Sequence, residues 1–217
     1  MLSPQLIASP VLDAAGHMAL DEAVLSASPP NALILRVYRW SGPGCTFGYS
    51  QKYEDAKAAC KAGVAPVRRA TGGGIVHHDG DTTFSLIFPW DKTCAPETIY
   101  KNIHRGIHQA LKARGVANGL WSPTQPAKGL AASCFARAEK ADLVDDDGVK
   151  ILGGALRKKG AKGLYQGSLR LPVAEEVLID GITREFGVPS LELDPSWLNE
   201  GIHLKEKYLS ADWTHRR

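Results

Sequence analysis

The sequence predicts an α+β domain in which helices flank a mixed or antiparallel sheet. Short strand-like segments follow one another along the chain with helical segments between them, which is typical of this class. A hydrophobic content of 44% and a charged content of 23% are ordinary for a globular protein. With 217 residues, the chain is long enough to bury a substantial core.

The N-terminal quarter predicts two helices and two strands. Residues 17–27 are expected to form a helix, and residues 32–40 alternate apolar and polar side chains as a half-buried strand does. A second strand is expected over 45–50, followed by a short helix over 53–62 that Gly63 ends.

A glycine-rich loop interrupts the next group of strands. Val67 and residues 75–77 flank this loop as strands. Residues 82–88 continue the sheet until Pro89, which lacks the amide hydrogen that a central strand needs. The sequence therefore predicts a glycine loop held by sheet on both sides.

Two amphipathic helices are expected in the second half of the chain. Over 97–114 an apolar side chain recurs every fourth residue, and Gly115 ends the helix. Residues 173–186 repeat this pattern, with apolar side chains on one face.

A hairpin is expected between these helices. Asp147-Gly148 is a hairpin turn signal between strands at 142–146 and 149–156, and a further strand is expected over 164–171.

Charge and cysteine content narrow the possible settings. A net charge of +3 is too small to indicate nucleic-acid binding. The four cysteines have no CxxC or metal-finger spacing, so free thiols in a reduced, cytoplasmic setting are expected. They are Cys45, Cys60, Cys94 and Cys134. The N-terminus lacks the pattern of a signal peptide, and no apolar run is long enough to predict a membrane span.

The most informative stretch is residues 68–79, which reads Arg-Arg-Ala-Thr-Gly-Gly-Gly-Ile-Val-His-His-Asp. Glycines allow positive φ and carry no Cβ, so several backbone N–H groups can converge on an oxygen-rich ligand. Arg68 and Arg69 can neutralise a carboxylate or phosphate with their forked donors. The spacing matches neither the Walker loop nor the dinucleotide fingerprint, and glycines alone also fit a tight turn.

His77, His78 and Asp79 raise the question of a metal site. Neighbouring residues on a strand point to opposite faces, so two adjacent histidines rarely bind one ion. A structural histidine, and no metal, is therefore expected here.

The glycine stretch resembles the catalytic domain shared by lipoate–protein ligases, lipoyl/octanoyl transferases and biotin protein ligases. The lipoyl branch has the core Arg-Arg-x-Thr/Ser-Gly-Gly-Gly/Arg-x-Val-x-His, followed by a strand like residues 82–85. Further segments resemble this family in its own order: residues 17–23, 35–40, 47–51, 149–155, 166–169 and 207–213. The resemblance covers nearly the whole chain and favours the lipoyl branch over biotin ligase.

This resemblance implies the biotin/lipoate ligase catalytic fold and an enzyme that attaches an octanoyl or lipoyl group to a lysine of lipoyl domains. The implied partners are 2-oxoacid dehydrogenase subunits or the glycine cleavage H protein, with acyl carrier protein as donor, and neither nucleic acid nor membrane. Many lipoate ligases carry a C-terminal accessory domain. Only 30 residues follow Gly187, so a single catalytic domain over 1–217 without that accessory domain is expected.

Lys150 and Cys134 are the predicted catalytic residues. A lysine on a strand before Gly153 and Gly154 can polarise an acyl carbonyl, although most strand lysines are simply solvated. Cys134, followed by phenylalanine, matches the nucleophile of one octanoyltransferase branch, whereas free cysteines are usually buried and inert. The resemblance assigns acyl or adenylate binding to Arg69, Thr71, Gly72, Gly73, Gly74, His77, Gly153 and Gly154.

Two routes and one non-catalytic alternative remain open from the sequence. In the preferred route, Cys134 takes the octanoyl group from acyl carrier protein without a cofactor. In the other, lipoate or octanoate is activated with ATP and magnesium to an acyl adenylate, for which the third glycine, Gly74, is more typical. The chain could instead be an acyl- or adenylate-binding subunit that needs a separate accessory protein.

Overall fold

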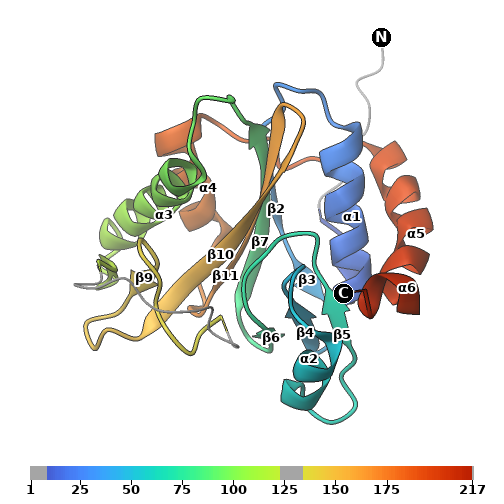
Figure 1. The fold of residues 1–217 in the computed structure, drawn as a ribbon. Helices are drawn as coiled ribbons and strands as arrows, with labels where there is room; N and C mark the ends of the chain where they lie inside the picture. The colour runs from blue at the N-terminus through green and yellow to red at the C-terminus, as the bar shows by residue number, and fades with distance from the viewer. Residues whose placement is uncertain (1–8, 123–133, 217) are drawn as a thin grey trace.

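The computed structural model describes residues 9–122 and 134–216, which form a six-stranded antiparallel sheet with a three-stranded sheet beside it (Figure 1). The order across the large sheet is β2 (Ile34–Val37), β7 (Thr82–Pro89), β11 (Lys162–Leu169), β10 (Lys150–Lys159), β9 (Leu143–Val144) and β8 (Gly119–Leu120). The small sheet has the order β5 (Pro66–Arg68), β4 (Gly44–Phe47) and β6 (Val76–His78), and a short parallel pair joins β1 (Val11–Leu12) to β3 (Arg39–Trp40). The predicted mixed or antiparallel sheet is confirmed.

Helices cover both faces of the large sheet (Figure 1). One face carries α3 (Pro96–Lys112) and α4 (Glu175–Phe186), and the other carries α1 (Ala14–Ala27) and α5 (Pro195–Leu209). Two short helices, α2 (Tyr53–Ala59) and α6 (Ala211–Thr214), lie near the small sheet. Within the described residues, no helix is both long and apolar enough to cross a membrane.

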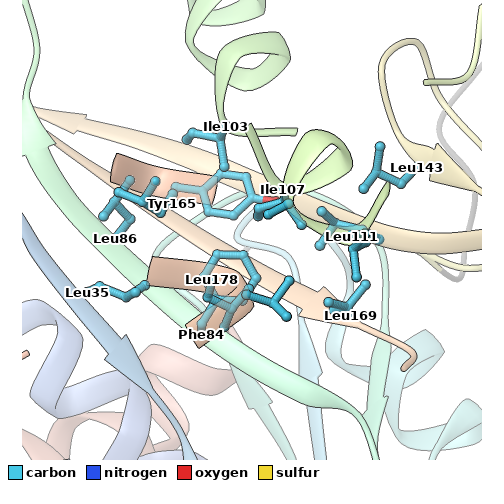
Figure 2. Close-up of a cluster of buried hydrophobic side chains, with 14 of the residues drawn as sticks. Leu35, Phe84, Leu86, Ile103, Ile107, Leu111, Leu143, Tyr165, Leu169 and Leu178 are labelled. Carbon is cyan, nitrogen blue, oxygen red and sulfur yellow. The ribbon is translucent and has the colours of Figure 1, made fainter. Parts of the chain in front are cut away.

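Alternation along β7 decides which side chains enter the main core. Phe84, Leu86 and Phe88 are buried against α3 and α4, whereas Ile87 points to the α1 side. Figure 2 shows Phe84 and Leu86 in one cluster with Ile103 of α3 and Leu178 of α4. The sheet therefore has two apolar faces, each covered by a helix pair.

Two glycines set the contact between α3 and α4. A Cβ on Gly106 would lie 2.0 Å from the carbonyl oxygen of Gly181. A Cβ on Gly181 would lie 2.9 Å from the backbone of Ile107. The two helices therefore touch backbone to backbone at this crossing.

The expected elements are present with shifted ends, and α5 was not predicted. The first helix begins at Ala14 because the side chain of Asp13 accepts a hydrogen bond from the Gly16 amide at 2.8 Å. The α5 helix begins after Asp194, whose side chain accepts from the Ser196 amide. Only Gly201 and Tyr208 of α5 are fully buried, so its apolar pattern in the sequence is weak.

The expectation of four free thiols is wrong for two of them. Cys45 in β4 and Cys60 at the end of α2 form a disulfide, with Cα atoms 6.3 Å apart. Cys94 and Cys134 are free. Spacing along the chain gave no hint of the bond because folding of α2 onto the small sheet brings the two sulfurs together.

Candidate active site

A cavity lies where the small sheet, the large sheet and α1 meet. Its lining comes from seven separate parts of the chain, which the fold brings together: Met18, Tyr38, Thr46, Arg69, Gly73, Val76, His78, Thr83, Cys134, Gly153, Gly154, Ala155, Gln166, Gly167 and Ser168. Its lining combines apolar walls with a few polar groups, as small-molecule sites commonly do.

The two predicted catalytic residues lie together in this region. The Lys150 ammonium is 3.5 Å from the Cys134 sulfur and 2.8 Å from a carboxylate oxygen of Asp142. Both Lys150 and Asp142 are buried. Asp142 also accepts hydrogen bonds from the Glu139 amide, at 2.6 Å, and from the Tyr100 hydroxyl. The carboxylate thus holds the lysine beside the thiol.

A tight hairpin brings Lys150 and Asp142 face to face. Lys150 begins β10 and pairs with Val144 of β9, and Asp142 lies just before β9. In the turn between them, the Asp145 side chain accepts from the Val149 amide at 2.8 Å, and Gly148 has a φ of +76°. The predicted Asp-Gly hairpin therefore also positions the lysine.

Gly153 and Gly154 make room for neighbouring side chains. A Cβ on Gly153 would lie 2.2 Å from Cε of Lys150 and 3.3 Å from the Cys134 sulfur. A Cβ on Gly154 would lie 2.3 Å from the Tyr165 ring. Gly153 therefore allows the lysine side chain to lie across β10 and reach the thiol, and Gly154 leaves room for the Tyr165 ring.

Cys134 is fixed through its main chain. Its amide donates to the carbonyl oxygen of Ile75 at 2.9 Å, directly after the glycine loop. The next ring, Phe135, lies 5.5 Å from the Lys150 ammonium and 3.7 Å from the Arg170 guanidinium. These contacts tie the thiol to both the glycine loop and the lysine strand.

Arg69 braces the glycine loop from within. Its guanidinium donates to the Thr46 hydroxyl at 3.0 Å and to the carbonyl oxygens of Gly72 and Gly74 at 2.7 and 2.9 Å. Burial lowers the pKa of Arg69 to about 10, and the neighbouring Cys134 partly opposes this lowering. Gly73 has a φ of +85°, which favours glycine at the centre of the loop.

Arg68 does not line the cavity, so the expectation that both arginines neutralise a carboxylate or phosphate is wrong for this residue. Its side chain is buried, and it donates to five backbone carbonyl oxygens. They belong to Tyr49, Gln51, Trp213, Thr214 and Arg216. In return, the Trp213 indole donates to the Arg68 carbonyl at 3.0 Å. Arg68 therefore anchors the C-terminal segment to β5.

The cavity contains His78, whereas His77, which was expected to bind the acyl group or adenylate, is not among its lining residues. His78 contacts the Thr46 hydroxyl at 2.8 Å and Asp81 at 3.0 Å, and its ring stacks on Trp40. Burial lowers the pKa of His78, and Asp81 partly opposes that effect. The family core quoted above places its histidine at position 78, which was the available signal.

A buried polar network supports the cavity beneath the loop. The Thr71 hydroxyl donates to Gln166 at 2.6 Å, and the Gln166 amide donates to Asp21 at 2.7 Å. Asp21 also accepts from Arg36 and from the Tyr38 hydroxyl. Burial, and after it the negative charge of Asp21, raises the pKa of Tyr38 well above its usual value, so the phenol stays protonated.

The structure thus brings most of the predicted site residues to one cavity and adds others. Thr71, Gly72 and Gly74 shape the loop, while Arg69, Gly73, Gly153, Gly154 and Cys134 line the cavity. Sequence reasoning missed Asp142, Asp21 and Gln166. The only sign of them in the sequence was a charged or polar residue within an otherwise apolar element, as Asp21 is in α1.

Known proteins share both the sequence and the fold. The family model of the lipoyl protein ligase A/B catalytic domain matches residues 13–182. A curated relative, the octanoyltransferase LipM of Oceanobacillus iheyensis, is 35% identical over 181 residues, which is 77% of this chain and 64% of that protein. The chain thus spans a little under two thirds of the length of this relative.

Two solved structures share the fold at low sequence identity. A lipoate-protein ligase A crystallised with ATP has a TM-score of 0.77 and 19% identity, covering 99% of both chains. A bi-partite lipoate protein ligase of Thermoplasma acidophilum, studied with its E2 lipoyl domain, has a TM-score of 0.74 and 19% identity, covering 99% of this chain and 96% of that one. Together with the family match, this places the chain in the lipoyl protein ligase A/B catalytic domain family.

Proposed function

We propose that this protein is an octanoyltransferase that moves an octanoyl group from acyl carrier protein to a lysine of a lipoyl domain. The observation that carries this proposal is the Cys134 sulfur 3.5 Å from the Lys150 ammonium, at the edge of a cavity that Cys134 helps to line. A thiol next to a buried cation is the usual arrangement of a nucleophilic cysteine.

In the first step, the Cys134 thiolate attacks the thioester carbonyl of octanoyl–acyl carrier protein. A new thioester forms on Cys134, the old carbon–sulfur bond breaks, and the carrier thiolate leaves and takes up a proton. The Lys150 ammonium, 3.5 Å from the sulfur, is placed to stabilise the negative oxygen of the tetrahedral intermediate.

In the second step, the neutral amine of the acceptor lysine attacks the acyl-enzyme. An amide forms, the Cys134 thiolate leaves, and the amine gives up a proton. Asp142 acts through Lys150, because its buried carboxylate holds the ammonium at 2.8 Å. Met18, Tyr38 and Val76 line the same cavity and give the acyl chain an apolar wall.

The relatives support a choice of partners. The 35% identical relative is named an octanoyltransferase, and the Thermoplasma ligase was studied with an E2 lipoyl domain. We therefore take a lipoyl domain as acceptor. Lys159 and Lys162 are paired at the β10–β11 turn and both contact Ser26 of α1, so they give a positive surface suited to an acidic carrier. Lys158 lies over Trp90 on the other face of the sheet, and Arg157 donates to the Ala70 carbonyl.

A ligase that uses ATP and magnesium is the second candidate, favoured by Gly74 in the loop. In that route, Arg69 would bind the adenylate phosphate. The hydrogen bonds of the Arg69 guanidinium instead go to Thr46, Gly72 and Gly74, which favours bracing over phosphate binding. The transferase route has no adenylate and needs no side chain to bind its phosphate.

Intact mass of a lipoyl domain after incubation with the protein separates these routes. One reaction holds octanoyl–acyl carrier protein without ATP, and the other holds free octanoate or lipoate with ATP and magnesium. We expect octanoylation in the first reaction and an octanoyl adduct on Cys134 when the acceptor is left out. Cys134→Ser should abolish both, whereas Cys94→Ser, at the other free cysteine, should abolish neither.

Two results would contradict the transferase. Modification only in the ATP reaction, indifferent to Cys134→Ser, would make the protein a ligase. Tight binding of the lipoyl domain with no mass gain in either reaction would make it a binding subunit.

A further inference from the structure

A second cluster of reactive side chains lies close to the cavity and takes no part in the proposed reaction. Cys45, Cys60 and His77 place their ligand atoms within 4.8 Å of one another. Cys45 is fully buried, and the other two are half-buried. In the structure, the two cysteines form a disulfide beside the histidine ring.

Strand pairing explains why these residues meet. Cys45 of β4 lies directly opposite His77 of β6 in an antiparallel register, so their side chains share one face of the small sheet. Cys60 reaches that face from the end of α2. The next residues along the strands, Thr46 and His78, point to the other face and line the cavity.

The surroundings suit a thiophilic metal ion. Cys45 lies in an apolar cluster with Phe47, Ala56 and Ile75, which shields its sulfur, while the half-buried Cys60 and His77 leave one side of the cluster open to water. Within residues 9–122 and 134–216, no hydrogen bond engages the His77 ring. Its nitrogen is thus available beside the two sulfurs.

We propose that Cys45, Cys60 and His77 bind a thiophilic divalent cation such as Zn²⁺ when the disulfide is reduced. Two thiolates and one imidazole supply three of the four ligands of a tetrahedral zinc ion, and water completes the set. This ion holds the sheet in place and does not enter the transfer reaction.

A dithiol reductant converts the disulfide form of the protein to the form that binds the metal. The reductant is oxidised to its own disulfide and delivers two electrons and two protons, which convert the Cys45–Cys60 bond to two thiols. Zn²⁺ then displaces both thiol protons as the two zinc–sulfur bonds form. The disulfide and the metal are thus alternative links between α2 and β4.

Either link lies next to the glycine loop. Thr46, the neighbour of Cys45, accepts from Arg69 at 3.0 Å and contacts His78 at 2.8 Å. Because Arg69 holds the carbonyls of the loop, the position of β4 bears on the shape of the cavity.

Zinc titration of the reduced protein tests this site. The background carries Cys94→Ser and Cys134→Ser, so that Cys45 and Cys60 are the remaining thiols among the four cysteines. Bound Zn²⁺ is measured by competition with a chromophoric chelator, and Co²⁺ is added separately to record its absorption. We expect about one ion per reduced chain and cobalt bands of a tetrahedral thiolate site.

Variants identify the ligands. Cys60→Ser and His77→Ala, both at half-buried positions, should each weaken Zn²⁺ binding by more than roughly 100-fold, since outer-shell partners alone account for 10–100-fold. His203→Ala, on the exposed surface of α5, should leave binding unchanged. Circular dichroism verifies that each variant is folded. The oxidised protein should bind no Zn²⁺.

Three results would overturn the proposal. They are no Zn²⁺ binding by the fully reduced chain, unchanged binding in folded Cys60→Ser and His77→Ala, and equal binding by the oxidised protein. The first would leave the two cysteines as a disulfide pair with no metal function.

Discussion

At the residue scale, the geometry around Lys150 depends on what is absent at position 153. The lysine side chain lies in the space that a Cβ of Gly153 would fill, 2.2 Å from Cε and 2.5 Å from Nζ. It is held there by Asp142 at 2.8 Å and reaches Cys134 at 3.5 Å. A side chain as small as a methyl group at position 153 is enough to move the ammonium.

Gly153→Ala should therefore lower activity much more than stability. We expect kcat for octanoyl transfer to fall roughly 100-fold, because a displacement of about 1 Å at a reacting group has that effect. Unfolding in urea should change little, because the atoms to be displaced are the end of a flexible side chain. Gly42→Ala, at an exposed glycine with no atom within 4 Å, is the matched control. Unchanged kcat in folded Gly153→Ala would refute this account of the lysine.

At the element scale, the contact between α3 and α4 depends on two glycines, one on each helix. Alanine has a higher helix propensity than glycine, by roughly 1 kcal/mol. In this crossing the added methyl would meet a backbone carbonyl oxygen at 2.0 Å, and backbone cannot turn aside as a side chain can. The energetic cost of the steric clash therefore exceeds the gain in helix propensity.

Gly106→Ala should lower the free energy of unfolding by about 1–3 kcal/mol, the usual range for overpacking a core. Denaturation in urea measures this change, and Gly42→Ala again serves as the comparison because it adds the same methyl in open space. A more stable Gly106→Ala protein would mean that the helices separate without penalty, contrary to the packing described.

At the scale of the whole molecule, two neutral histidines are buried on opposite sides of the large sheet. His17 lies on α1 and His104 on α3. Burial lowers the pKa of each to about 3, with a further lowering by Arg36 for His17 and by Lys150 for His104. Since the unfolded chain has histidine pKa values near 6.5, it binds more protons than the folded protein between about pH 3 and pH 6.5.

Stability should accordingly be full above pH 6.5 and decrease as the pH falls below it. Each histidine should contribute about 2 kcal/mol to the loss between pH 7 and pH 5. His104→Gln, which can still bond to Tyr165, should lose about 2 kcal/mol less over that interval than the unaltered protein. Urea unfolding at both pH values measures the difference. The exposed His203→Gln should behave like the unaltered protein, and an identical loss in His104→Gln would disprove the assignment.

The sequence by itself determined the local elements and the chemistry they carry. Apolar side chains at helical spacing predicted α3 and α4, and the Asp-Gly pair predicted the hairpin that begins β10 at Lys150. The glycine loop and the Cys134-Phe135 pair resemble the lipoyl branch of a known family, and that resemblance implied a lipoyl-type site. These signals are readable because each depends on residues only a few positions apart.

The tertiary structure alone decided which of these residues meet. Asp142 reaches Lys150 because the hairpin between β9 and β10 closes. Cys134 reaches Lys150 because its amide bonds to the Ile75 carbonyl, far away in the sequence. His78 rather than His77 faces the cavity, and here the position of the histidine in the family core had already given the answer. Arg68 and Arg69 are neighbours, yet one anchors the C-terminal segment while the other braces the loop.

The disulfide and α5 have the same explanation. Cys45 meets Cys60 because α2 folds against the small sheet, and α5 is stabilised by packing on α1 more than by its own pattern. Contacts between segments far apart in the chain leave no periodic trace in either segment. They depend on the packing of the whole domain, which is why only the tertiary structure could establish them.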